Sequence, residues 1–387
     1  MKILLVSELD PGFHRGGAYI RIRNLIKVLA AEHDVALLTG TDGRADAAEF
    51  FDGKWDRLPD LKTRIKGMHL FRHGCYLYPN RKYLSAIEDA ARAHDADLIL
   101  FDYMYWGHYV DVLKSQGWAC WMDTHNSQSA LLWQRIVKYK AVGLLPTWFF
   151  RVLQERFLFK RFERVFCVSE PDVVFHRRFM PSEQVVLLPN FINLEDFDEV
   201  RARRDEHAEK DGIDIIVAGG YQTFQNRLGV EWLLEQVWPA VHARHPHARL
   251  TIAGSAAEQY FQTDLSAGIR VVSDPPRMEP YFEEADISLV PILHGSGTRF
   301  KVLESLASKL PLVGTAIGVE GIAVRDREHC CIADTPEAFS AAIIALISSP
   351  SERSQMADDG FELVATHYSE RTARQILESE LERVEQS

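Results

Sequence analysis

Short, continuous apolar runs alternate with amphipathic stretches along this chain of 387 residues. The first run, residues 2–6, opens into a glycine-containing loop, and a helical pattern then extends from Tyr19 to Glu32. Runs without polar alternation are typical of parallel strands buried on both faces. The pattern therefore predicts a parallel sheet with intervening helices. Further runs lie at 35–39, 97–101, 117–122, 165–168 and 185–188.

The residues at 198–212 carry a dense mixture of charges and almost no apolar side chains, which predicts a solvated linker or surface helix. The chain is too long for one compact core. We therefore expect two α/β domains, at 1–197 and 213–365, with a charged terminal helix at 366–387. The second domain is expected to contain strands at 213–218, 248–253, 269–272, 286–290 and 311–314 and helices at 228–244 and 299–309.

Composition narrows the function classes. Lys and Arg number 44 against 55 Asp and Glu, a net charge of −11, which argues against a nucleic-acid partner bound through a global basic field. Five cysteines without a C-x-x-C pair indicate reduced thiols rather than a disulfide framework or zinc site. The chain shows neither an apolar stretch of about 18 to 20 residues nor a signal-peptide pattern at its start. We expect a cytoplasmic protein, able to touch a membrane from that side.

Ligands of doubly wound domains bind beyond the carboxyl ends of the strands, so the residues after each run are informative. The stretch His294–Glu304 follows one such strand. Gly295 and Gly297 allow a close backbone approach, and Thr298 is a candidate N-cap. Arg299 and Lys301 then fall at the start of a helix, where the macrodipole disfavours cations unless an anion binds. This pattern favours a phosphate site over a surface pair of Lys301 with Glu304.

Two loops in the first half are weaker candidates. The loop at 10–18 contains Gly16 and Gly17 but neither a dinucleotide fingerprint nor a P-loop, so a plain turn is an equal alternative. Polar residues at 123–128 follow a strand, and among them His125 is either structural or a site residue. No close spacing of histidines and carboxylates indicates a metal site.

The stretch 134–164 carries eight Lys and Arg against two Glu, with seven aromatic residues interleaved. Cations beside aromatic side chains suit a helix lying on an anionic membrane surface. The alternative is a helix that buries its aromatic residues in the domain core while its cations are solvated.

At these residues the chain resembles the GT-B glycosyltransferases, specifically the retaining family 4, over most of its length. The resemblance implies two facing Rossmann-like domains with an interdomain cleft, a nucleotide-sugar held mainly by the second domain, an acceptor bound by the first, and a C-terminal helix that crosses back onto the first domain. The motifs that carry it are Gly16-Gly17, Asp123–Asn126, Val168–Glu170, Leu188–Asn193 with Phe197, Gly295–Glu304 and Pro311–Gly321.

Roles carried over from the family place Arg299 and Lys301 on the donor diphosphate and Glu304 on the ribose hydroxyls. Gly17 would let a loop approach the phosphates or the sugar, and His125 would lie over the transferred sugar. The remaining candidates for donor binding are Gly16, Gly295, Ser296, Gly297 and Thr298, with Asp123, Asn126 and Arg227 as further possibilities.

The sequence departs from the family pattern at two places. Ser296 stands where the first Glu of the usual E-x7-E pair is expected, eight residues before Glu304. The usual Gly-Arg-Leu and Lys phosphate clamp is replaced by Gly219-Gly220-Tyr221 and Gln225-Asn226-Arg227. Phosphate binding is therefore expected to rest on Arg299 and Lys301, and the contribution of Arg227 is open.

The resemblance predicts transfer of a sugar from a nucleoside diphosphate donor to a glycan or lipid-linked acceptor, with retention and in cell-surface polysaccharide or glycolipid synthesis. Preorganised cations and helix N–H groups would stabilise the leaving diphosphate, so no metal cofactor is expected. The alternatives are an epimerase or hydrolase on the same fold and a non-catalytic nucleotide-sugar-binding partner. A dehydrogenase is disfavoured because neither domain carries a dinucleotide fingerprint.

Overall fold

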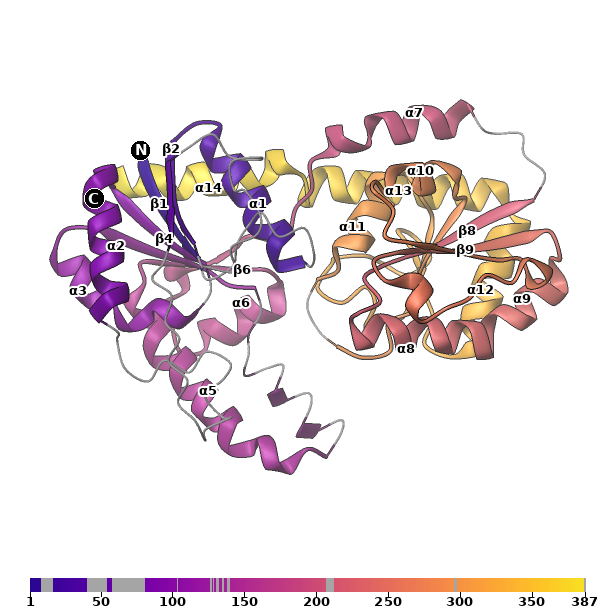
Figure 1. Ribbon diagram of the computed structural model, residues 1–387, viewed down its shortest axis with the longest axis horizontal. Coiled ribbons are helices and arrows are strands. Elements are labelled where there is room, and N and C mark those ends of the chain that lie inside the picture. Colours follow the sequence, from indigo (N-terminus) through magenta and orange to yellow (C-terminus); the bar gives the residue numbers. More distant parts are fainter. Residues whose placement is uncertain are drawn as a thin grey trace. The chain divides into compact units, whose positions relative to one another are not determined.

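The computed structural model describes residues 1–7, 17–39, 54–57, 81–102, 104–125, 127, 129, 132–133, 136–137, 140–206, 212–295 and 298–385. The chain divides into two compact units (Figure 1). Unit 1 comprises Met1–Pro189 and Arg374–Ser387, and unit 2 comprises Asn190–Ala373. Each unit contains a sheet whose described strand pairs are all parallel, with helices packed on it.

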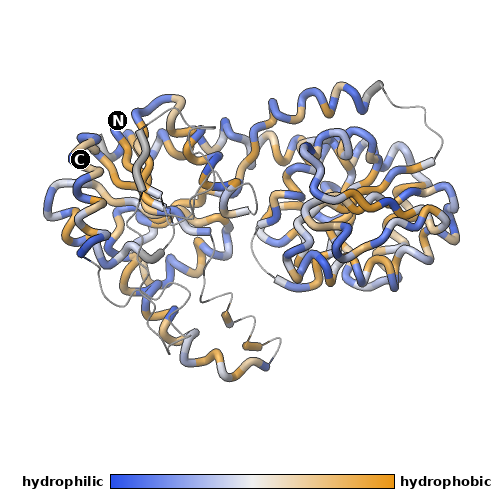
Figure 2. The backbone as a smooth tube through the Cα atoms, viewed as in Figure 1, coloured by the Kyte–Doolittle hydropathy of each residue, from blue (hydrophilic) through white to orange (hydrophobic). Residues whose placement is uncertain are grey.

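The sheet of unit 1 has seven strands in the order β3-β2-β1-β4-β5-β6-β7. Its core lies where apolar side chains of the strands meet the helices, and Figure 2 shows the hydrophobic segments concentrated in the strands. The strands are β1 (Lys2–Ser7), β2 (Asp34–Thr39), β3 (Lys54–Arg57), β4 (Leu98–Asp102), β5 (Ala119–Asp123), β6 (Arg164–Cys167) and β7 (Val185–Leu187). The helices are α1 (Gly17–Ala30), α2 (Arg81–His94), α3 (Val110–Ser115), α5 (Leu145–Leu158) and α6 (Glu170–Arg177).

The sheet of unit 2 has six strands in the order β10-β9-β8-β11-β12-β13. The strands are β8 (Ile213–Ala218), β9 (Ala248–Gly254), β10 (Ile269–Ser273), β11 (Ile287–Val290), β12 (Leu312–Gly314) and β13 (Cys331–Ile332). The helices are α7 (Asp198–Glu206), α8 (Phe224–Trp232), α9 (Trp238–Arg244), α10 (Glu279–Glu284), α11 (Phe300–Ala307), α12 (Pro336–Ser348) and α13 (Pro350–His367). A π-helical turn, Leu233–Val237, interrupts the single helix predicted at 228–244.

Two doubly wound α/β units confirm the predicted fold class. The strand order reverses beside β1 in unit 1, because β2 lies on one side and β4 on the other, and beside β8 in unit 2, between β9 and β11. Such switch points form crevices at the carboxyl ends of the strands, where ligands of this fold bind. They direct attention to the residues after β1 and β4, and after β8 and β11.

The division of the chain falls between Pro189 and Asn190, and not within 198–212 where the charge pattern placed it. The first part of that stretch forms α7, which docks on unit 2 through its arginines. Arg201 donates to the carbonyl of Ala307 at 2.8 Å, and Arg204 donates to the carbonyl of Phe282 at 3.1 Å. Arg201 and Arg204 therefore bind backbone carbonyl groups of unit 2, whereas the charge pattern predicted that they would face solvent.

The terminal helix predicted at 366–387 is observed at Glu370–Glu385. After α13, a short turn leads into α14 (Glu370–Glu385), whose residues from Arg374 onward belong to unit 1. There Glu380 accepts a hydrogen bond from Arg164 Nε at 2.5 Å, and Glu378 Oε1 lies 3.0 Å from His33 Nε2. The yellow end of the chain in Figure 1 accordingly lies with the indigo and purple elements of unit 1.

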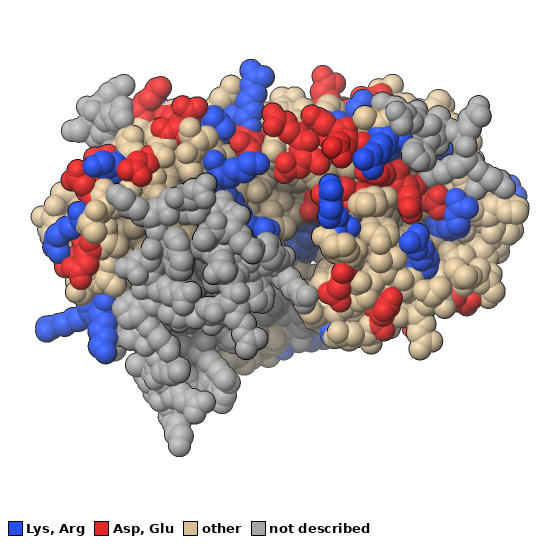
Figure 3. Space-filling model, turned by 45° about the horizontal axis from the view of Figure 1, so that its top comes forward, with Lys and Arg blue, Asp and Glu red and all other residues tan. Residues whose placement is uncertain are grey.

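The described surface carries cations and carboxylates side by side. Figure 3 shows Lys and Arg interspersed with Asp and Glu on one face, and the ion pairs of α7, such as Arg203 with Glu283 at 3.2 Å, are of this kind. Exposed pairs like these contribute little to stability, typically less than about 1 kcal/mol. Among the described residues, no helix has both the length and the apolar composition to cross a bilayer.

Candidate functional site

The predicted phosphate site lies at the switch point of unit 2. Lys301, in the first turn of α11, donates from Nζ to Asn226 Oδ1 of α8 at 3.0 Å. A Cβ atom at position 219, just after β8, would lie only 2.8 Å from that Nζ. Gly219 therefore makes room for the ammonium group at the end of the strand. Burial, and secondarily the charge of Arg299, lowers the pKa of Lys301 to about 8.

Arg299 occupies the N-cap position of α11, and no side chain caps this helix. Its Nη2 would be 3.0 Å from a Cβ atom at position 295, where Gly295 has a φ of 116° that other residues rarely adopt. Burial lowers the pKa of Arg299, and Glu320 opposes this effect. Two partly desolvated cations at a helix N-terminus form an environment that an anion would stabilise.

Glu304 lies one turn further along α11. Burial raises the pKa of its carboxyl group to about 6, although Lys301 favours the ionised form. A carboxylate one helical turn beyond a phosphate site can accept hydrogen bonds from ribose hydroxyls. The structure thus brings Arg299, Lys301 and Glu304 together on one short helix.

Thr298 does not cap α11 as predicted. Arg299 takes the N-cap position, and Thr298 Oγ1 instead accepts a hydrogen bond from Asn190 Nδ2. The contact ties the loop before α11 to the first residue of unit 2. Ser296 and Gly297 lie outside the described residues.

Arg227 holds the neighbouring loop in place. Its Nη1 donates to the carbonyl oxygens of Tyr221 and Gln222, each at 3.0 Å, and its guanidinium lies 4.4 Å from the ring centre of Tyr260. These contacts give Arg227 a structural role in the loop that follows β8. A role in phosphate binding stays a prediction.

In unit 1, polar residues that end three neighbouring strands form a connected network. Ser7 ends β1, Asp102 ends β4 and Asp123 ends β5, and Asp102 and Asp123 are register partners. Ser7 Oγ donates to Asp102 Oδ2 at 2.6 Å, and His125 Nε2 lies 2.6 Å from Asp102 Oδ1. Arg21 from α1 donates to both oxygens of Asp123, at 2.7 and 2.5 Å.

The charge of His125 follows from this network. Burial by itself would lower the pKa of His125, but Asp102, and more weakly Asp123, raise it above its ordinary value. Its side chain is 10% exposed, whereas that of Asp102 is 1% exposed. The imidazole thus has a small exposed surface, whereas the carboxylate that holds it has almost none.

Ser7, Arg21 and Asp102 are absent from the residues singled out in the sequence. The signal for Ser7 and Asp102 was available, since each is the polar residue that ends a continuous apolar run. Arg21 gave none, because a cation on a helix is ordinarily exposed, and its burial is explained by its pairing with Asp123 and its hydrogen bond to the carbonyl of Leu188.

Asp102, Asp123 and His125 offer ligand atoms within 4.8 Å of one another, as a metal site would. The residues do not fit a cation, however, because their oxygens already accept hydrogen bonds from Arg21, Ser7 and His125. A guanidinium bound bidentately to Asp123 both occupies its ligand atoms and repels a metal ion. These residues therefore form a buried ion-pair network and not a metal site.

The other candidate residues of unit 1 are less informative. Gly17 is the exposed first residue of α1, which begins at the carboxyl end of β1. This place is compatible with the predicted approach to a ligand, and that role stays a prediction. Gly16 and Asn126 lie outside the described residues.

The aromatic residues of the stretch 134–164 divide between the core and the surface of unit 1. Phe159 and Phe162 are buried in the core of unit 1. Phe149 and Phe157 on α5 are instead 59% and 60% exposed. We call the exposed residues of this region the α5 surface; they are the apolar Trp133, Val137, Val142, Leu145, Phe149 and Phe157 and the basic Lys140, Arg156 and Lys160.

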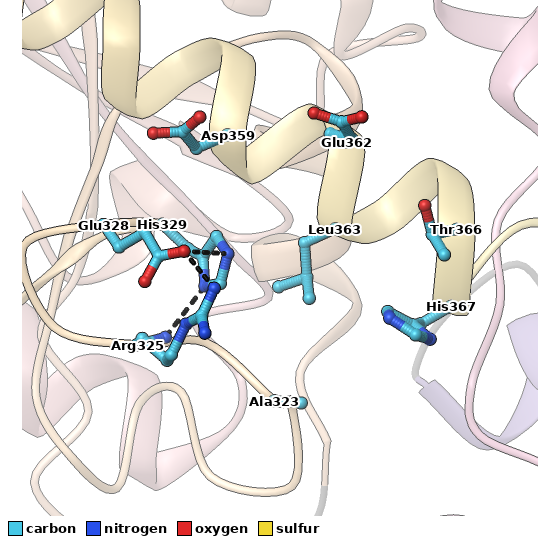
Figure 4. Close-up of a pocket in the computed structure, with 9 residues that line it drawn as sticks. All are labelled: Ala323, Arg325, Glu328, His329, Asp359, Glu362, Leu363, Thr366 and His367. Atoms are coloured by element: carbon cyan, nitrogen blue, oxygen red, sulfur yellow. Dashed lines mark hydrogen bonds and ion pairs between the residues drawn. The ribbon is translucent and has the colours of Figure 1, made fainter.

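A cavity of about 420 Å³ lies elsewhere in unit 2, between the loop at 323–329 and α13 (Figure 4). Its charges largely satisfy one another, because Glu328 pairs with Arg325 and lies 3.6 Å from His329. No residue predicted from the sequence as a site residue lines it. Its lining consists of Ala323, Arg325, Glu328, His329, Asp359, Glu362, Leu363, Thr366 and His367.

Each of the two units matches a known protein family. The family model "Glycosyltransferase Family 4" matches residues 15–196, and the model "Glycosyl transferases group 1" matches residues 212–349. Sucrose-phosphate synthase from Thermosynechococcus elongatus has the same fold, with a TM-score of 0.69 and 19% identity over 99% of this chain and 98% of that one. Anabaena HepE, solved with UDP-glucose, matches with a TM-score of 0.66 and 12% identity, and the match covers 99% of this chain and 100% of HepE.

A curated relative is an uncharacterized 44.6 kDa protein in the cps region of Klebsiella pneumoniae, 25% identical over 164 residues. That alignment spans 40% of this chain and 42% of the relative. The strand order and these structural matches show the GT-B fold. The chain belongs to glycosyltransferase family 4, as the two family models together show.

Proposed function

We propose that unit 2 binds a nucleoside diphosphate sugar and that the enzyme transfers the sugar to a glycan or lipid-linked acceptor in cell-surface polysaccharide or glycolipid synthesis. The observation that carries this proposal is the placement of Arg299 and Lys301 at the N-terminus of α11, with Lys301 held against Gly219 and its pKa lowered to about 8. A bound diphosphate would compensate the desolvation of both cations.

Leaving-group stabilisation is the proposed source of catalysis. The diphosphate gains negative charge as the glycosidic bond breaks, and cations already in place stabilise that charge without reorganisation. Transfer with retention would follow from attack on the same face of the sugar, with a departing phosphate oxygen accepting the acceptor proton. His125 would orient the sugar, and Glu304 would bind the ribose.

The relatives support the choice of substrates. Anabaena HepE was solved with UDP-glucose, which makes a uridine diphosphate sugar the first donor to test. The relative from Klebsiella pneumoniae is encoded in a cps region, in keeping with an acceptor from cell-surface polysaccharide synthesis.

The donor assignment is tested by thermal stabilisation with UDP, GDP, ADP and dTDP. A ligand at 100 times its dissociation constant adds about 2.7 kcal/mol, so one base should raise the melting temperature clearly. Lys301→Ala should abolish most of that shift. Lys309→Ala, which removes a partly exposed lysine just after the C-terminal end of α11, should not. Equal shifts in both variants would refute the phosphate assignment.

Transfer is tested separately with the donor selected in this way and with lipid-linked and glycan acceptors. Appearance of glycosylated acceptor is the expected result, and the configuration of the new bond reports retention or inversion. Release of free sugar with no transferred product would indicate a hydrolase, and an isomerised donor would indicate an epimerase. Binding without any turnover would indicate a nucleotide-sugar-binding partner protein.

We also propose that the α5 surface lies on an anionic membrane at its cytoplasmic face. Its exposed Phe149 and Phe157 would enter the headgroup region, and Lys140, Arg156 and Lys160 would attract acidic lipids. The buried Glu155 anchors this helix to the domain, because it accepts hydrogen bonds from Ser127 and Ser129. The acceptor would then reach unit 1 from the lipid side.

Flotation with vesicles of phosphatidylglycerol and phosphatidylcholine tests this surface. Binding should require the anionic lipid, decrease between 50 and 300 mM salt, and fall in a Phe149→Ser, Phe157→Ser double variant. Leu265→Ser, which changes an even more exposed apolar residue of unit 2, is the control. Binding that persists in the double variant, or no binding at low salt, would remove the proposal.

A further inference from the structure

The least expected feature of unit 1 is the enclosed carboxylate behind His125. The side chain of Asp102 is 1% exposed. Its Oδ2 accepts a hydrogen bond from Ser7 Oγ at 2.6 Å, and its Oδ1 lies 2.6 Å from His125 Nε2. Its backbone carbonyl accepts a further hydrogen bond from the indole of Trp106 at 3.1 Å. Asp102 is therefore fixed at main chain and side chain, and His125, which contacts it, is the more exposed of the two side chains.

This geometry determines which ring nitrogen carries a proton. A carboxylate accepts hydrogen bonds and has none to donate, and Ser7 already donates to its second oxygen. The short contact with Asp102 Oδ1 therefore requires a proton on His125 Nε2. A base oriented by a buried acid is a common arrangement in nucleophilic enzymes, but the same contact also favours the doubly protonated ring.

Among the described residues, the other charged groups that shift the pKa of the ring are Asp123 and Arg21, and they act in opposite directions. Asp123 lies one strand away and favours the cation, whereas Arg21 disfavours it. Arg21 is bound to both oxygens of Asp123, so this pair is close to neutral as seen from the ring. Asp102 is thus the dominant partner, and the pKa of His125 is raised in spite of its burial.

We propose that Asp102 is a positioning residue that keeps His125 in its protonated form, so that His125 serves the reaction as a hydrogen-bond donor toward the bound sugar and not as a general base. The inference rests on the proposed sugar transfer for its meaning in catalysis. The protonation of His125, however, is a property of unit 1 alone and can be measured without any substrate.

The first test is a titration of the full-length protein by nitrogen-15 NMR of the histidine rings. The 15 histidines make assignment by a His125→Gln spectrum necessary. Nε2 of His125 should be protonated over the whole pH range of the titration, and the ring should stay charged above pH 6.5. Asp102→Asn should lower its pKa by about 1 or more, whereas Asp111→Asn, which removes an exposed carboxylate of the same unit, should leave it unchanged. A wild-type ring that is neutral at pH 6.5, with its proton on either nitrogen, would overturn the proposal, even if Asp102→Asn failed to fold.

The second test is the pH dependence of kcat at saturating donor. A donor role predicts that kcat falls as pH rises through the pKa of His125, and that Asp102→Asn moves this fall to lower pH. A decline caused by Lys301 would stay in place, since Lys301 lies in the other unit. If kcat instead rose through the same pKa, His125 would be acting as a base and the proposal would be wrong. Absence of transfer in the wild type would contradict the proposed function but not the titration result.

Discussion

Protonation of Lys301 should be linked to diphosphate binding. In the free protein the pKa of this ammonium group is about 8, against 10.5 for lysine in water. The difference corresponds to about 3 kcal/mol by which burial and Arg299 disfavour the charged form. A diphosphate bound beside Nζ removes that penalty and raises the pKa again, so binding and protonation favour each other.

The magnitude follows from the free-state value. With a pKa of about 8, about half of the free molecules carry a neutral Lys301 at pH 8, so binding should take up about 0.5 proton per site. The uptake should be about 0.1 proton at pH 7 and about 0.9 at pH 9, and the affinity should fall about tenfold between these two values. The terminal phosphate itself contributes little, because its second ionisation lies near pH 6.

Isothermal titration calorimetry measures both quantities. The nucleoside diphosphate that stabilises the protein most is titrated at pH 7, 8 and 9 in buffers of different ionisation enthalpy, and the dependence of the binding enthalpy on the buffer gives the proton uptake. Lys301→Arg is the decisive control, since arginine stays charged throughout and should abolish the uptake at pH 8. Uptake below about 0.1 proton in the wild type at pH 8, or equal uptake in the arginine variant, would refute the reasoning.

Other consequences concern stability and the ribose. The ring of His176 is fully buried, its nitrogens have no hydrogen-bond partner among the described residues, and burial lowers its pKa to about 3, below the ordinary value of 6.5. The unfolded chain therefore gains a proton first as pH falls, and unit 1 should lose about 2 kcal/mol between pH 8 and pH 5. His176→Leu should flatten the pH dependence of the melting temperature and the exposed His247→Leu should not; an unchanged slope in both would contradict this. Glu304→Gln should weaken binding of UDP more than of its 2′,3′-dideoxy analogue, and an equal loss for both would exclude the ribose contact. Arg21→Met should destabilise unit 1 by about 3 to 5 kcal/mol, because Asp123 would be left buried without its partner, and the Asp123→Asn, Arg21→Met double variant should recover part of this in urea unfolding; no recovery would argue against the pair.

The sheets could be predicted from the sequence because continuous apolar runs mark parallel strands. Residues 213–218 were predicted as a strand and form β8 with the same bounds. The two strands that were missed, β3 and β13, lie at sheet edges. The first reads Lys-Trp-Asp-Arg and the second has two residues, so neither gives an apolar run.

The site in unit 2 could be predicted because its residues are neighbours in sequence. Arg299, Lys301 and Glu304 follow one strand on one helix, and helix geometry alone brings them together. The network in unit 1 joins residues from α1, β1, β4 and β5. Its bonded partners Arg21 and Asp123 are 102 positions apart, and only the strand order places such residues side by side.

The path of the chain has a consequence for biosynthesis. Unit 1 is closed by residues of α14, including Leu377 and Leu381, which are almost completely buried, yet the 184 residues of unit 2 from Asn190 to Ala373 are made in between. At about 5 to 20 residues per second, a ribosome needs roughly 10 to 40 s to synthesise that insertion. During this time the apolar surface of unit 1 that later receives α14 is uncovered, whereas unit 2 is contiguous and can fold as it emerges. The order of completion is therefore opposite to the order of the first strands, and unit 1 is the part of this enzyme whose core stays incomplete until the end of synthesis.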